Sequence, residues 1–128
     1  MKKQKTHRLG DLQLQIMKVL WDRDEANVSQ VLELLPRGGA LAYTTIATML
    51  RKMEQRGLIG HSVEGRSFIY HAKVTAQEVS RSMANHLVDK LFEGSLTQAV
   101  SHLLSTREVS REELAKLERL IAERKKNP

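Results

Sequence analysis

The chain has 128 residues, of which 41% are hydrophobic and 28% are charged, a composition typical of a small globular protein. It contains no cysteine, which excludes disulfides, thiolate metal sites and a cysteine nucleophile. The net charge is +6, and the residues through Val74 include 12 basic and 7 acidic ones, so most of the excess lies there. This distribution favours a polyanionic partner, either a nucleic acid or an anionic membrane surface.

The first two predicted helices are amphipathic. Apolar residues at helical spacing predict a first helix over Asp11–Asp22, with Trp21 near its end as an anchor at the edge of the core. A short second helix is expected to begin after Asn27 or Ser29, which are both good N-cap residues, and to end before Pro36.

A third helix is predicted within the stretch "LAYTTIATMLRKMEQRGLI" (Leu41–Ile59). We expect Thr44 to cap its N-terminus and Gly57 to adopt the left-handed conformation at its C-terminal end. The apolar face of this helix consists of Ile46, Met49, Leu50 and Met53, which follow helical spacing.

After this helix the residue pattern changes from a helical repeat to one typical of β-strands, which predicts a β-hairpin. Two runs rich in β-formers, Leu58–Val63 and Arg66–Ala72, flank a predicted two-residue turn at Glu64–Gly65. Phe68 and Tyr70 are expected to share one face of the second strand.

Three further helices are predicted after the hairpin. Thr75 with Glu78, and Ser110 with Glu113, form capping-box patterns that open the first and the last of these helices. Long apolar rows on helices with little else to cover predict a symmetric dimer interface, for which the candidates are Val79, Met83, Leu87, Leu91, Leu114, Leu117 and Ile121.

The order of these elements is that of a winged helix-turn-helix followed by helices. The predicted fold class is therefore mainly α with a small β-hairpin. We expect a winged-helix domain at 9–74 and a helical dimerisation region at 75–125.

The second face of the predicted third helix is polar and then basic. Threonine is a mediocre helix former, so three of them at the start of one helix need an explanation. Short hydroxyl side chains can approach base edges in a DNA major groove, and the basic residues that follow can reach phosphates. An ordinary solvated helix face is the alternative. Because a short helix and a Gly-containing loop (Arg37–Gly39) precede this helix and a hairpin follows it, we favour contact with DNA by Thr44, Thr45, Thr48, Arg51, Lys52 and, beside the hairpin turn, Arg66.

Other kinds of site have little support in the sequence. No phosphate-binding glycine loop, nucleophile elbow or HExxH helix is present, so we expect neither an enzyme nor a cofactor. His61 and His71 could approach each other across the hairpin, but two histidines are too few ligands for a typical metal site, and we expect none. The lack of cysteine fits a cytoplasmic protein, and because no apolar run is long enough for a membrane span we expect no membrane partner.

The segments "LGDLQLQIMKVLW" and "LAYTTIATMLRKMEQRGLI", with a hairpin ending in "FIYHAKVT", resemble the penicillinase-repressor and methicillin-resistance-repressor family of bacterial transcription regulators. The resemblance covers nearly the whole chain from Leu9 and is stronger through Thr75 than beyond. It implies a homodimeric repressor bound to a dyad-symmetric operator in double-stranded DNA. It also implies that the third helix reads bases, that the wing touches the DNA backbone, and that the C-terminal helices form the dimer.

The chain departs from the family pattern at two places. Ala47 stands where some relatives carry a basic residue, so the resemblance does not fix the operator sequence. In the best-known members a membrane-bound metalloprotease system triggers cleavage of an Asn-Phe bond, and the matching position here is His102–Leu103. An inducing protease is therefore left open as a partner, and the lack of cysteine excludes the copper sensing of other relatives.

Two rival functions remain at this point. A winged helix used as a protein-interaction module would bind any duplex weakly and without sequence preference. An accessory subunit of an enzyme is the third possibility.

Overall fold

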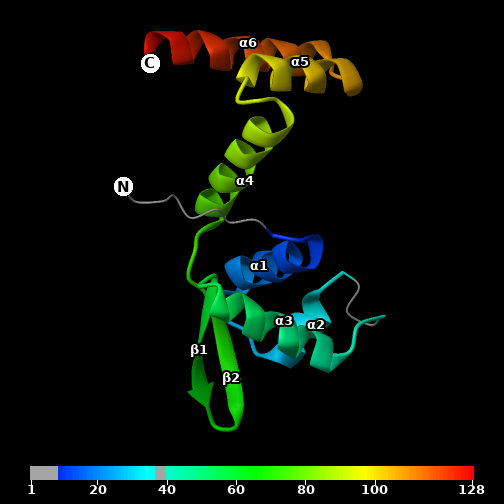
Figure 1. The fold of residues 1–128 in the computed structure, drawn as a ribbon, viewed down its shortest axis with the longest axis vertical. Coiled ribbons are helices and arrows are strands. Elements are labelled where there is room, and N and C mark those ends of the chain that lie inside the picture. Colours follow the sequence, from blue (N-terminus) through cyan, green and yellow to red (C-terminus); the bar gives the residue numbers. More distant parts are fainter. Residues whose placement is uncertain (1–8, 37–39) are drawn as a thin grey trace. The chain divides into compact units, whose positions relative to one another are not determined.

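The computed structural model describes residues 9–36 and 40–128, and within these ranges the chain forms six helices and one two-stranded antiparallel sheet (Figure 1). The predicted fold class, mainly α with a small hairpin, is confirmed. The chain divides into two compact units, one ending at Asn85 and the other beginning at His86. The elements in chain order are α1 (Asp11–Arg23), α2 (Val28–Leu34), α3 (Tyr43–Gln55), β1 (Ile59–Glu64), β2 (Ser67–Ala72), α4 (Ala76–Leu91), α5 (Leu96–Thr106) and α6 (Arg111–Lys126).

Helix α2 is capped by a reciprocal pair of hydrogen bonds. The Gln30 amide donates to Asn27 Oδ1 at 2.8 Å, and the Asn27 amide donates to Gln30 Oε1 at 2.9 Å. Of the two candidate caps, Asn27 is therefore the one used, and the helix ends before Pro36 as expected. The loop expected next, Arg37–Gly39, lies outside the described residues.

Helix α3 begins earlier than its threonines imply. Its N-cap is Ala42, whose carbonyl accepts from the amides of Thr45 at 3.0 Å and Ile46 at 3.3 Å. The prediction that Thr44 caps this helix is therefore wrong, because backbone groups alone close the first turn and Thr44 already lies inside the helix. The expected left-handed residue is confirmed, since Gly57 has φ 80°. The buried face of α3 consists of Ile46, Leu50 and Met53.

Strands β1 and β2 pair as far as the rung formed by Glu64 and Ser67. The turn consequently consists of Gly65 and Arg66, so the predicted turn at Glu64–Gly65 is one residue too early. Gly65 has φ 64°, a left-handed conformation that glycine adopts without strain, whereas Glu64 remains in the extended strand. Arg66 therefore lies in the turn itself, at the end of the wing.

A backbone bridge joins the hairpin to the connection between α1 and α2. The Ala26 amide donates to the Tyr70 carbonyl at 3.0 Å, and the Tyr70 amide donates to the Ala26 carbonyl at 2.8 Å. Strand β2 is thus held on one side by β1 and on the other by Ala26.

One hydrophobic core unites the three helices and the hairpin of the first unit. Its centre is formed by fully buried side chains of α1 and α3: Ile16, Met17, Leu20, Ile46, Leu50 and Met53. Trp21 packs at the edge of this core and donates from Nε1 to the Val74 carbonyl at 2.9 Å, which confirms its predicted anchoring role. The core holds α3 and the wing as parts of one body.

Burial raises the pKa of Tyr70 above its ordinary value of 10.0, and the Glu54 carboxylate acts in the same direction. In the unfolded chain this phenol loses its proton first, so the free energy of unfolding should fall as pH rises from about 10 toward the pKa of the folded state. We expect Tyr70→Phe to lose less stability than wild type between about pH 9 and about pH 11, measured by urea unfolding. Tyr43→Phe is the comparison at an exposed tyrosine (53%), and its effect should be smaller because Tyr43 is the last of the causes that raise the pKa of Tyr70. Equal pH slopes for wild type and Tyr70→Phe would contradict the assignment.

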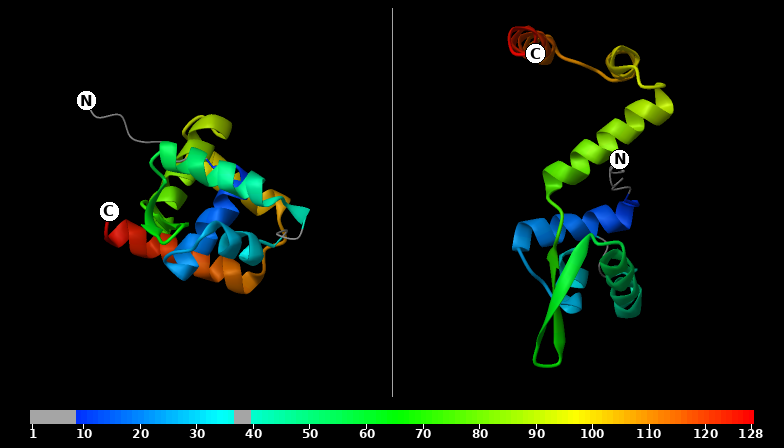
Figure 2. Two further views of the ribbon diagram at one scale, coloured as in Figure 1. Left: turned by 90° about the horizontal axis from the view of Figure 1, so that it is seen from below. Right: turned by 60° about the vertical axis from the view of Figure 1, so that its left-hand side comes forward.

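The second unit buries little of its own apolar surface. Between His86 and Pro128, a range described in full, Ala99 is the only buried residue. Helices α5 and α6 lie apart in the right-hand view of Figure 2. Their N-termini are capped by Ser95 and by Ser110, the second as predicted, with 3.1 Å bonds from the amides of Gln98 and Glu113. The unit exposes Leu87, Leu91, Leu96, Val100, Leu103, Leu104, Leu114, Leu120 and Ile121.

Helix α4 opens with the predicted capping box, since the Glu78 amide donates to Thr75 Oγ1 at 3.0 Å and the Thr75 amide donates to Glu78 Oε1 at 3.3 Å. The helix begins in the first unit and ends in the second. A functional boundary between residues 74 and 75 remains a prediction.

No helix in the described ranges combines the length and the apolar character needed to cross a bilayer.

Candidate nucleic-acid interface

Four of the predicted contact residues lie together on one side of α3. Thr44, Thr45, Thr48 and Lys52 line a shallow hollow of about 360 Å³, which Met49 completes. Thr44, Thr45 and Lys52 are exposed and Thr48 is half-buried. The hollow is thus lined by short side chains at the start of α3 and by the cationic side chain of Lys52 at its other end.

Arg51 lies on a neighbouring face of α3, where a cleft of about 540 Å³ separates this helix from the hairpin. Arg66, at the wing turn, lines the same cleft. The structure therefore brings the predicted cations of helix and wing to one groove, although 15 positions separate them in the sequence. Such a groove, with a cation on each wall, is suited to a nucleic-acid backbone.

Tyr43 and Phe68 are two residues of this cleft that the sequence interpretation did not select. Tyr43 is 53% exposed at the first position of α3, and Phe68 is 48% exposed on β2. Tyr43 could have been identified from the sequence by its helical spacing. It precedes Ala47 by four residues and Arg51 by eight, so the three share one face of the helix. Ala47 is half-buried, and its methyl side chain leaves the cleft open.

Helix α1 orients the C-terminal half of α3 through Gln13. Arg56 Nη1 donates to Gln13 Oε1 at 3.1 Å, and Gln13 Nε2 lies 3.4 Å from Met49 Sδ. Arg56, the C-cap residue that follows α3, is thus directed toward α1, whereas Arg51 and Lys52 of α3 line the two hollows.

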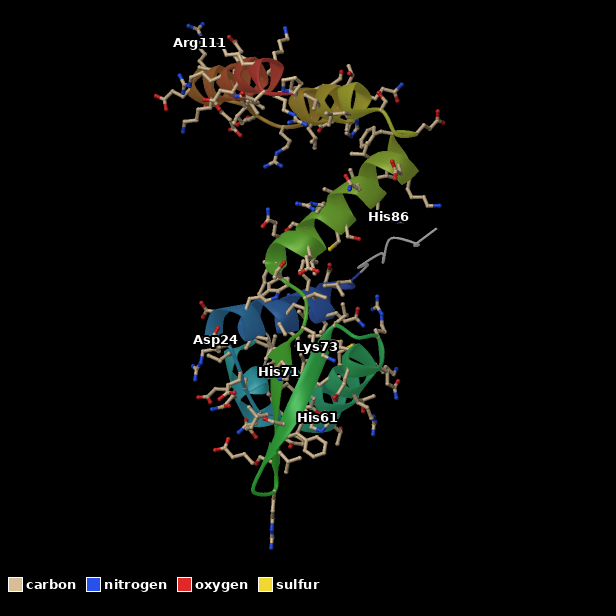
Figure 3. The ribbon with its side chains drawn as sticks, turned by 90° about the vertical axis from the view of Figure 1, so that its left-hand side faces the viewer. Asp24, His61, His71, Lys73, His86 and Arg111 are labelled. Carbon is tan, nitrogen blue, oxygen red and sulfur yellow. The ribbon has the colours of Figure 1, made fainter. Side chains whose placement is uncertain are left out.

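A carboxylate of α3 and an imidazole of β1 meet across the cleft. His61 Nδ1 lies 2.6 Å and 2.8 Å from the two carboxylate oxygens of Glu54, and both side chains are about one-third exposed. The His61 ring also stacks on Phe68 with centroids 4.2 Å apart and an interplanar angle of 15°. Figure 3 shows His61 nearer the tip of the hairpin than His71.

The two hairpin histidines do not form a pair. His61 is opposite Tyr70 and His71 is opposite Gly60, so their side chains belong to opposite faces of the ribbon. Across residues 9–36 and 40–128, no three His, Cys, Asp or Glu side chains lie close enough together to hold a metal ion.

The predicted dimer residues fall into three classes of exposure. Val79 is 1% exposed and hence already covered within the chain, whereas Met83 and Leu117 are half-buried. The exposed members are Leu87, Leu91, Leu114 and Ile121. The sequence interpretation did not select five other exposed apolar residues of α5 and α6: Leu96, Val100, Leu103, Leu104 and Leu120.

Comparison with known proteins agrees with this geometry. The sequence profile of the family described as Penicillinase repressor matches residues 9–123. The chain is 26% identical over 121 residues to the penicillinase repressor of Bacillus licheniformis, covering 94% of each chain. It is 34% identical over 122 residues to the transcriptional regulator BlaI of Mycobacterium tuberculosis, covering 93% of this chain and 86% of that protein.

Among solved structures, the DNA-binding domain of the repressor BlaI matches with a TM-score of 0.51 and 29% identity. The match covers 59% of this chain and 93% of that domain. The profile and the relatives each extend over most of the chain, well beyond the winged-helix part. The chain therefore belongs to the penicillinase repressor family.

Proposed function

We propose that this chain is a sequence-specific DNA-binding transcriptional repressor that acts as a homodimer on a dyad-symmetric operator. The observation that carries the proposal is the joint placement of a threonine-lined hollow on α3 and a two-arginine cleft between α3 and the wing. Hydroxyl and methyl groups of threonine suit base edges, and the flanking cations suit phosphates. Membership in a family of repressors also confirms the expectation that the chain is not an enzyme.

In this proposal α3 is the recognition helix. Thr44, Thr45 and Thr48 enter the major groove, because short side chains permit a close approach to bases. Lys52 follows the DNA backbone on one side of α3, and Arg51 and Arg66 follow it in the cleft.

The dimer of the proposal rests on the second unit. Helices of 11 and 16 residues are marginal in water unless an apolar face is covered, and this unit leaves nine large apolar side chains exposed. A second copy supplies the complementary apolar surface, and a dyad axis then matches two recognition helices to two half-sites.

We assign no inducing protease to this chain. His102 and Leu103 lie within α5, and the His102 carbonyl accepts from the hydroxyls of Ser105 and Thr106, each at 2.9 Å. Proteolysis concentrates at exposed loop tips, so cleavage at this bond requires local unwinding of α5.

Selection of bound fragments from the source genome should yield duplexes that share a two-fold symmetric motif. Given that motif, Thr48→Ala should cost about 1–3 kcal/mol of preference at the contacted base pair. Arg51→Ala should weaken binding to all sequences more evenly, because a phosphate contact carries no base information. Fluorescence anisotropy with the selected duplex and single-base variants measures both effects.

Thr97→Ala is the control, because Thr97 is an exposed threonine of α5 that lies outside the proposed DNA-contacting residues. Weak binding without any shared motif would instead support a protein-interaction module. Unchanged base preference in Thr48→Ala would remove this threonine from the base contacts.

A further inference from the structure

The inner face of the hairpin is defined by its register. His61 and Val63 of β1 lie on the same face as Phe68 and Tyr70 of β2, because side chains alternate along each strand and these residues pair across it. Exposure on this face rises toward the tip: Tyr70 is 5% exposed, Phe68 48% and Val63 63%. The hairpin is therefore packed against the unit near its base and exposed at the rung of Val63 and Phe68.

The rung formed by His61 and Tyr70 is held from two sides. On the β2 side, Tyr70 makes two backbone hydrogen bonds with Ala26. On the β1 side, the His61 side chain contacts both carboxylate oxygens of Glu54 on α3. Beyond this rung the wing projects toward Arg66, so the rung is the last level at which these bonds tie the wing to the rest of the unit.

The stack on Phe68 fixes the ring plane of His61. With centroids 4.2 Å apart and rings within 15° of parallel, Phe68 covers one face of the imidazole. The ring is thereby oriented to donate from Nδ1–H to the carboxylate. Phe68 is the second residue of β2 and lies two positions after the turn residue Arg66. One aromatic contact therefore connects the wing end to α3 through His61.

The charged groups around His61 allow a second role for its contact with Glu54. Glu54 presents a carboxylate on the same wall of the groove as Arg51, while Tyr43, Tyr70 and Arg66 line the remainder. An unpaired carboxylate there would repel DNA phosphates. Masking of that charge by His61 is therefore the alternative to a positioning role.

We propose that Glu54 and His61 form a clasp that sets the angle of the wing against the recognition helix, so that Arg66 and Arg51 engage the same DNA strand. His61 is a positioning residue in this arrangement. The inference rests on the proposed function for its DNA consequence, whereas the clasp itself is testable without DNA.

The DNA-free test measures the wing position directly. The chain has no cysteine, so Lys18→Cys and Glu64→Cys, both at exposed positions of the first unit, carry a unique pair of nitroxide labels. Electron–electron distance measurements should give a narrow distribution in the labelled parent protein and a broader one in its His61→Ala derivative. His71→Ala is the matched control, because it removes a histidine from the other face of the same hairpin. An unchanged distribution in His61→Ala overturns the clasp.

The DNA test uses a double-mutant cycle. We expect His61→Ala to weaken operator binding about tenfold. In that background Arg66→Ala should have little further effect, because Arg66 no longer contacts DNA when the wing is not held in position. Glu54→Gln should stay near wild type, since the amide oxygen still accepts from His61 Nδ1–H. Independent, additive effects of His61→Ala and Arg66→Ala would overturn the positioning role.

Two further outcomes distinguish a failure of the clasp from a failure of the proposed function. If Glu54→Ala restores binding in the His61→Ala background, the role of His61 is charge masking and the positioning proposal is overturned. If wild type binds operator and scrambled duplex equally well, the proposed function is wrong. The distances between the two nitroxide labels then still decide whether the clasp exists.

Discussion

Raising monovalent salt from about 50 mM to about 200 mM is expected to weaken operator binding by about 10³-fold. Three cations per protomer, Arg51, Lys52 and Arg66, line the proposed interface. A dimer that neutralises six phosphates with them releases counterions with a slope of about −5 in log K against log salt. Four-fold more salt then gives about three orders of magnitude. Anisotropy titrations at several salt concentrations measure this slope.

The same titrations assign the slope to individual residues. Arg66→Ala should reduce its magnitude by about 2, one contact from each protomer, and Lys52→Ala by the same amount. Lys116→Ala is the control, because Lys116 lies on α6 in the second unit. A slope near zero for wild type would contradict phosphate contact, and an unchanged slope in Arg66→Ala would remove the wing from the interface.

The winged-helix part could be predicted from the sequence because its signals are local. The 3.6-residue period of α3, the change to a two-residue period and the glycines at both turns are each contained within a few positions. The two errors, Thr44 as N-cap and a turn at Glu64–Gly65, are shifts of one or two residues. Backbone groups alone cap α3, and Glu64 pairs with Ser67 in the last rung of the hairpin, which moves the turn to Gly65 and Arg66.

The candidate interface could be predicted only in part. The spacing of residues along a helix shows which of them share a face, but it does not show the groove between that helix and the hairpin. The sequence pattern assigned Thr45, Thr48 and Lys52 to the polar face of one helix, and the structure places all three in one hollow. The cleft between Arg51 and Arg66 depends on how the hairpin packs against α3, which no local pattern encodes. The contact of His61 with Glu54 and Phe68 joins three elements and was invisible for the same reason.

In the second unit, the sequence pattern identified apolar stripes without showing what covers each position. Val79 belongs to the predicted stripe but is already buried within the chain, and periodicity cannot distinguish burial by the same chain from burial by a partner. Exposure in the single chain makes that distinction, and it directs the dimer test to Ile121 rather than to the half-buried Leu117.

Ile121→Glu is expected to convert a dimer into a monomer at micromolar concentration and to abolish tight operator binding. Ile121 is 56% exposed in the single chain, so the folded protomer tolerates a carboxylate there. In the proposed dimer the same position is buried, where an unpaired charge costs several kcal/mol, enough to weaken association more than about 100-fold. Loss of the dimer removes the high effective concentration of the second recognition helix at its half-site.

Sedimentation equilibrium gives the mass of each protein, and anisotropy gives operator affinity on the same samples. Lys116→Glu is the matched control, because it places the same carboxylate on α6 about 140° around the helix from Ile121 at 100° per residue. The control should remain dimeric and bind operator, even though it changes the net charge more than Ile121→Glu does. Circular dichroism should show that both variants remain helical, because α1 to α3 are held by their own core. A wild-type monomer at micromolar concentration, or an Ile121→Glu protein that dimerises and binds operator like Lys116→Glu, would show that the exposed apolar face of α6 is not the surface where two copies meet.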